Sequence, residues 1–165
     1  MVEPWLRGPI AGMPPVVMPA AHALMQAAED ITAAAAGLTV EQLWKRPGGA
    51  AAVGFHLKHL AGSIDRLLTY ARGEALSPSQ LAAIAGEQDP EASPASAATL
   101  ASEAVAAIER AIDVMRNVPP ASYFEPRAVG RRNLPTNVLG LLVHVAEHTQ
   151  RHAGAIIATS KVVRG

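Results

Sequence analysis

Apolar side chains recur every three to four residues over four long stretches of the chain, and strand-type alternation is nearly absent. This spacing places the apolar side chains on one face of a helix, where they can pack against similar faces. Glycine and proline residues separate the stretches, as is typical of helix ends. The pattern predicts an all-α chain with long helices near residues 19–36, 51–72, 94–117 and 135–160.

Shorter elements connect these helices. The segment Thr-Val-Glu-Gln at 39–42 fits a capping box and predicts a short helix. Ser-Pro-Ser-Gln at 77–80 predicts the start of another, with proline at its favoured first position. Residues 88–93 predict a loop, and residues 120–134 predict an irregular connection before a helix that begins at Pro135. The chain therefore predicts one four-helix-bundle domain over residues 1–165 with long crossover connections, in which residues 1–18 are irregular.

Composition excludes several classes of function. The chain has 14 basic and 14 acidic side chains, and this balance argues against nucleic acid and anionic membranes as partners. Because cysteine is absent, any metal site must use nitrogen and oxygen ligands. The N-terminal region contains charges and prolines rather than a signal peptide, and no uncharged apolar run is long enough to span a membrane. We expect a soluble, cytoplasmic protein.

Five of the six histidines lie in two short clusters, at 56–59 and 144–152. Histidines four residues apart on a helix point the same way, about 6 Å apart along the axis, so two of them can bind one cation. His144 and His152 are about 12 Å apart and cannot share an ion. The apolar arc of the last helix favours His148 with His152 as the inward-facing pair.

A third ligand would come from the second helix, where two histidines compete. His56 lies closer to the main apolar stripe, and the helical wheel slightly favours it. His59 lies on a second, mixed stripe with Phe55, Gly62, Arg66 and Tyr70 that could line a pocket. The wheel leaves both histidines open, and it makes Arg66 and Tyr70 candidate substrate-binding residues.

Three neutral imidazoles would leave one coordination position of a divalent ion open for water or substrate. Ordinary packed or exposed histidines are the alternative explanation of both clusters. Glu147 could orient a ligand or face solvent. Three further arginines before the last helix could anchor an anion or form a solvated loop: Arg127, Arg131 and Arg132.

The same segments resemble the DinB/YfiT-like family of bacterial four-helix bundles. The resemblance runs through Trp-Lys-Arg-Pro at 44–47, His-Leu-Lys-His-Leu-Ala-Gly-Ser at 56–63 and the histidine-rich segment 142–154. The family pattern has one histidine on helix two and His-x-x-x-His on helix four. Carried over residue by residue, it implies His59, His148 and His152 as metal ligands. Ala155 departs from the pattern, because many members have glutamine at that position.

The resemblance also implies an up-down-down-up bundle, often a homodimer, and metal-dependent chemistry with small thiols such as mycothiol or bacillithiol. The resulting hypothesis is a metalloenzyme that acts on a small-molecule substrate as a transferase, isomerase or hydrolase. Zinc is the expected metal, with nickel or manganese as alternatives, and no catalytic acid or base is assigned. The competing hypothesis is a non-catalytic metal-binding or stress-related interaction bundle.

Overall fold

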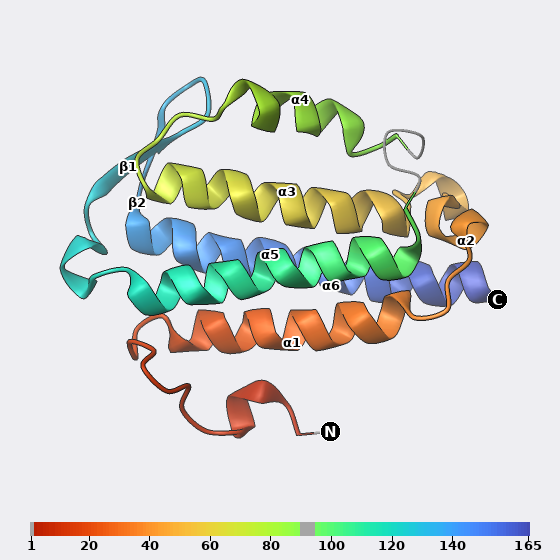
Figure 1. Cartoon of the computed structure of the whole chain (residues 1–165), viewed down its shortest axis with the longest axis horizontal. Helices are drawn as coiled ribbons and strands as arrows, with labels where there is room; N and C mark the ends of the chain where they lie inside the picture. The colour runs from red at the N-terminus through yellow and green to blue at the C-terminus, as the bar shows by residue number, and fades with distance from the viewer. Residues whose placement is uncertain (1, 90–94) are drawn as a thin grey trace.

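Four long helices form the body of the protein in a computed structural model that describes residues 2–89 and 95–165. They are α1 (Met18–Ala35), α3 (Val53–Ala71), α5 (Ala97–Asn117) and α6 (Val138–Arg164). Both α1 and α3 pack against α5 and α6. In Figure 1, α1 and α6 run in one direction, and α3 and α5 run in the other. Consequently, α3 and α6 are antiparallel neighbours.

The core lies where the apolar faces of these helices meet. Burial of one large apolar side chain contributes roughly 1.5–3 kcal/mol, and all four helices supply such side chains. Buried alanines on α1 and α5, such as Ala27 and Ala107, let the helices approach closely because they have almost no side chain. The largest fully buried side chains of the core include Leu24, Ile31, Leu57, Leu60, Ile64, Leu100, Ile108, Met115, Leu142 and Ile156.

The first two predicted long helices are confirmed within two residues at each end. The third begins at Ala97, where the Ser96 side chain accepts a hydrogen bond from the Thr99 N–H at 3.1 Å and caps the helix. The predicted start at Ser93 and Pro94, and most of the predicted loop at 88–93, lie outside the described residues.

The region before α6 corrects two predictions. Strand β1 (Pro126–Val129) pairs antiparallel with β2 (Leu134–Asn137), so the connection is a hairpin rather than irregular, in a chain that is mostly helical as expected. Pro135 lies in β2 and does not begin a helix. Instead, α6 begins at Val138, because the Asn137 side chain accepts a hydrogen bond from the Gly140 N–H at 2.7 Å.

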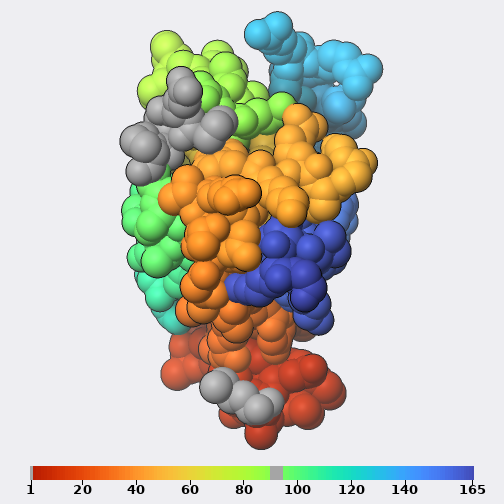
Figure 2. Space-filling view, turned by 90° about the vertical axis from the view of Figure 1, so that its right-hand side faces the viewer, coloured from red at the N-terminus to blue at the C-terminus, as the bar shows by residue number. Residues whose placement is uncertain are grey.

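The other elements within residues 2–89 and 95–165 are short: α2 (Val40–Trp44), α4 (Pro78–Gly86), and the 3-10 turns η1 (Pro4–Leu6), η2 (Pro47–Gly49) and η3 (Pro120–Ser122). The predicted capping box at the start of α2 and the predicted helix start at Ser77 are confirmed, and α4 also begins with a capping box. The space-filling view shows α4 and the hairpin as two separate prominences at one side of the bundle, opposite the N-terminal segment (Figure 2).

None of the helices in the described ranges combines the length and apolar character needed to cross a membrane.

Candidate metal centre

Three histidines converge between α3 and α6. His59 lies in the middle of α3, and His148 and His152 lie one helical turn apart on α6. One ring nitrogen from each lies within 4.8 Å of the others, and the ring centroids are 4.6–5.3 Å apart. Tetrahedral zinc with Zn–N distances of 2.0–2.1 Å needs nitrogens about 3.3 Å apart. The nitrogens would therefore have to approach one another by up to about 1.5 Å to share one ion.

The packing of α3 against α6 determines where the three histidines lie. Leu57 and Leu60 on α3 are fully buried, as are Val145 and Thr149 on α6. His59 directly precedes Leu60, and His148 directly precedes Thr149. His152 lies one helical turn after His148, and all three histidines are half-buried at the edge of the core. The helix–helix interface thus sets the backbone positions of the three histidines.

The Nδ1 atom of every ring in this cluster has a partner outside it. His59 Nδ1 lies 2.6 Å from Glu87 Oε2, and His152 Nδ1 lies 2.9 Å from His56 Nδ1. His148 Nδ1 lies 3.3 Å from Ser63 Oγ, whose hydroxyl donates to the Leu60 carbonyl at 3.0 Å. Engagement of Nδ1 leaves Nε2 of each ring free. Metal-binding histidines in proteins commonly have this arrangement, in which the second nitrogen is held by a carboxylate, a hydroxyl or another polar group.

Electrostatics keep the rings on α6 in the form that binds a cation. Burial, followed by repulsion from neighbouring histidines, lowers the pKa of His148 and of His152 to about 4. Burial and the charge of His59 also lower the pKa of His56. The imidazoles of His148 and His152 are therefore neutral near pH 7 and have lone pairs available for a metal.

Glu87 is the acidic group beside this cluster. It follows α4 directly and is only 5% exposed. Burial alone would raise the pKa of Glu87, but hydrogen bonds from His59 and Arg66 outweigh it and lower the pKa below its usual value. The Arg66 guanidinium binds the other carboxylate oxygen, Oε1, at 2.7 Å. Glu87 is thus ionised and joins α4 to two side chains of α3.

The remaining histidines lie outside the cluster of three. His56 contacts His152, so the residue that the helical wheel favoured lies beside the cluster. His144 is exposed and lies 2.9 Å from Glu147, which also pairs with Arg151. Glu147 therefore faces solvent on α6, in agreement with one of its two predicted roles.

The other predicted site residues are divided between two regions. Arg66 reaches the cluster through Glu87. Tyr70 lies about 16 Å farther along α3 than His59 and lines a separate cavity of about 630 Å³ with Arg127 and Arg131. Arg127 is held by the Ala71 carbonyl at 2.7 Å and by Glu125 at 3.0 Å. The assignment of Arg66 and Tyr70 to substrate binding stays a prediction.

A smaller cavity of about 230 Å³ lies on the far side of Phe55 from the cluster and has no histidine in its lining. Phe55 forms one wall, and its ring stacks on His59 with centroids 5.3 Å apart and an interplanar angle of 18°. Trp44 adds a second aromatic wall and Arg46 adds a positive charge. Further lining comes from Ala51, Ala52 and Gln88.

Two residues of the site escaped prediction from sequence. Glu87 occurs at the end of a short helix, 28 positions from its partner His59, and no local pattern relates them. Ser63 lies one helical turn after His59 and ends the segment 56–63 that resembles the family, so its position on α3 was predictable. The contact of Ser63 with His148, 85 positions away, was not predictable from the sequence.

The arrangement defines a class of protein: a helical bundle with three convergent histidines between two antiparallel helices. The family model of the DinB superfamily matches residues 23–156, a range that includes all three. The chain therefore belongs to the DinB superfamily. No curated protein matches it significantly.

Proposed function

We propose that this DinB-superfamily protein is a metal-dependent enzyme in which His59, His148 and His152 bind one divalent ion. One observation carries the proposal: three histidine nitrogens lie within 4.8 Å of one another while each ring has a partner at Nδ1. Each Nδ1 has its partner outside the cluster, which leaves Nε2 as the nitrogen that would bind the ion. The donor set suits zinc, and nickel or manganese are alternatives.

A divalent ion held by three neutral nitrogens supplies Lewis-acid chemistry, which lowers the pKa of a bound water to about 7 or favours the thiolate form of a small thiol. The chain's own residues would bind and orient the reactants. Phe55 offers an apolar face beside His59, Trp44 adds a second aromatic wall to the cavity, and Arg46 can attract an anionic group of the substrate or thiol. We propose the cavity that these residues line as the substrate site.

The reaction that fits this site is transfer, isomerisation or hydrolysis of a small molecule, with a low-molecular-weight thiol as a co-reactant in the first two. We further propose that the four long helices are the family's up-down-down-up bundle. The competing proposal is a bundle that binds metal without catalysis. An accessible coordination position occupied by water would support an enzyme, and a closed four-ligand site would support the alternative.

The first experiment is elemental analysis of the purified full-length chain, followed by zinc titration. We expect one ion per chain, abolished in His148→Ala because both candidate pairs on α6 include this ring. His144→Ala is the matched control on the same helix and should keep stoichiometric binding. Retention of tight binding in His148→Ala would refute the site. A thiol-dependent activity screen on the zinc-loaded protein then separates the enzyme from the non-catalytic bundle.

We also propose a homodimer, on the basis of the family resemblance. Exposed apolar side chains on α4, Leu81 and Ile84, are available for such an interface. Light scattering should give a mass near twice the 17.1 kDa of the chain. A mass of one chain at micromolar concentration would contradict the proposal.

A further inference from the structure

Helix α4 is docked on the bundle mainly by polar contacts. Each of its nine residues keeps at least partial exposure, and Leu81 and Ile84 are 46% and 44% exposed. Figure 1 shows α4 running alongside α3 on the outside of the bundle. With little apolar burial available, hydrogen bonds at its two ends must determine where it lies.

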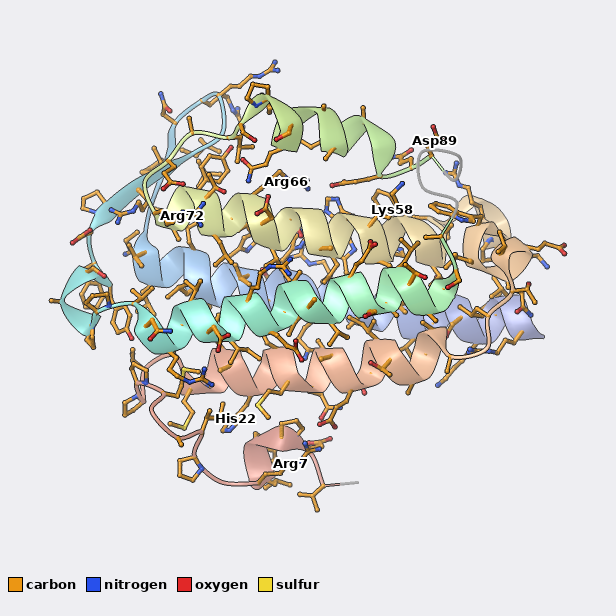
Figure 3. All side chains as sticks on the ribbon, viewed as in Figure 1. Arg7, His22, Lys58, Arg66, Arg72 and Asp89 are labelled. Carbon is orange, nitrogen blue, oxygen red and sulfur yellow. The ribbon has the colours of Figure 1, made fainter. Side chains whose placement is uncertain are left out.

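The end near α3's C-terminus is held by Gln80. Its Nε2 donates to Asp65 Oδ2 at 2.6 Å and to Thr69 Oγ1 at 2.8 Å. The opposite end is held by Lys58, which donates to the Gly86 carbonyl at 2.5 Å and the Asp89 carbonyl at 3.0 Å. Figure 3 shows Lys58 and Asp89 at this end, with Arg66 farther along α3. Only the second end lies beside the histidines.

At that second end, the Glu87 carboxylate contacts His59, the one histidine of the three that does not lie on α6. His148 and His152 are spaced by α6 itself, whereas His59 comes from another helix and must turn toward them. Glu87 Oε2 lies 2.6 Å from His59 Nδ1, while Arg66 holds the other oxygen at 2.7 Å. The Nδ1 partners of the other two rings, Ser63 and His56, carry no carboxylate.

The sequence of α3 makes room for this carboxylate. Gly62 lies inside the helix, where glycine destabilises by about 1 kcal/mol relative to alanine. A Cβ at this position would lie 2.8 Å from Glu87 Oε1 and 2.8 Å from the Arg66 guanidinium. The missing side chain therefore allows Glu87 to reach α3, and the helix accepts a less favourable residue there.

We propose that Glu87 is the positioning residue of the metal centre: it accepts the His59 Nδ1–H and thereby directs Nε2 toward His148 and His152. This inference rests on the proposed function, since it requires that the three histidines bind metal. It has a second consequence, because coupling between two binding events is reciprocal. If docking of Glu87 strengthens metal binding, then bound metal strengthens the docking of α4 by the same factor.

The test is the zinc affinity of the full chain, measured by competition with a chromophoric chelator. We expect Glu87→Ala to weaken zinc binding by about 10- to 100-fold, as is common for a partner that orients a metal-binding histidine. Glu87→Gln keeps an acceptor without the charge and should lose less. Hydrogen exchange adds a second readout: zinc should protect the α4 amides in the wild-type protein and not in Glu87→Ala.

Gln80→Glu is the matched control on α4. Glutamate preserves the capping box with Ser77 but cannot donate to Asp65 and Thr69, so the variant disturbs the docking of α4 away from the histidines. Its zinc affinity should stay within about threefold of wild type. Equal losses in Gln80→Glu and Glu87→Ala would show that α4 acts only as a structural cover and would overturn the positioning role.

Gly62→Ala tests the same idea without removing the carboxylate. The added methyl group should displace the Glu87–Arg66 pair, so zinc affinity falls although the carboxylate is still present. Wild-type affinity in both Gly62→Ala and Glu87→Ala would refute the inference and leave the proposed metal site intact. Failure of the wild-type protein to bind zinc would refute both.

Discussion

The Nδ1 atoms of His56 and His152 lie 2.9 Å apart, so one of these nitrogens donates a proton and the other accepts it. If His152 binds metal through Nε2, its Nδ1 has the proton and His56 Nδ1 is the acceptor. His56 is then a residue that orients a ligand. This relationship assigns the two neighbouring histidines of α3 different roles, although they are only three residues apart.

The first prediction follows from this assignment. His56→Ala should retain one metal ion per chain, with affinity weakened about tenfold because His152 loses its hydrogen-bond acceptor. His59→Ala should abolish stoichiometric binding. Zinc titration of the two variants side by side makes the comparison. Loss of metal in His56→Ala with retention in His59→Ala would show that the family pattern was carried over three residues out of place.

The second prediction concerns the pH dependence of the metal-free protein. Burial lowers the pKa of His148 and His152 to about 4, whereas histidine in an unfolded chain titrates near 6.5. Between these values the unfolded chain binds protons that the folded chain does not, so stability falls as the pH falls. Urea unfolding in EDTA should therefore show a declining midpoint from pH 6.5 toward pH 4.5.

A double variant, His148→Asn with His152→Asn, is the control for this profile and should be flatter over the same range. Keeping the measurement above pH 4.5 separates the histidines from carboxylates such as Glu87, whose pKa lies below its usual value. An equally steep profile in the double variant would assign the acid sensitivity to other groups.

Most of the helical framework was predictable because local signals determine it. The capping boxes at Thr39 and Ser77 begin α2 and α4 where the sequence predicts. The hairpin was not predictable in the same way, because strands of four residues offer too few alternations and Pro135 resembles a helix start. Only pairing with β1 across the turn reveals that Pro135 belongs to a strand.

The candidate site was predictable to the extent that it depends on one helix. Four-residue spacing allowed His144 with His148 or His148 with His152, and the apolar arc of the helix favoured the second pair, which lies beside His59 in the structure. The choice between His56 and His59 depends on how α3 is rotated against α6 and on contact with α4, which a helical wheel does not contain. Only the family resemblance pointed to His59, and the contact of Glu87 with His59 needed the tertiary structure.

The third prediction tests the observed start of α6. Asn137→Ala should destabilise the protein by about 1 kcal/mol, because the Gly140 N–H loses its side-chain acceptor. Asn137→Asp should retain most of the stability, since aspartate caps helices comparably. Denaturant unfolding measures both variants. If α6 instead began at Pro135, Asn137 would lie inside the helix and alanine would stabilise it.

The fourth prediction links metal to stability. A ligand that binds only the folded state stabilises it by RT ln(1 + [L]/Kd), which is about 2.7 kcal/mol at a concentration 100 times Kd. Zinc should therefore raise the melting temperature of the wild-type chain, and EDTA should reverse the shift. His148→Ala should show no such increase, whereas His144→Ala should keep it because His144 lies outside the three-histidine cluster, with its ring against His148 and its Nδ1 on Glu147. A similar increase in His148→Ala would place the stabilising zinc ion elsewhere in the protein.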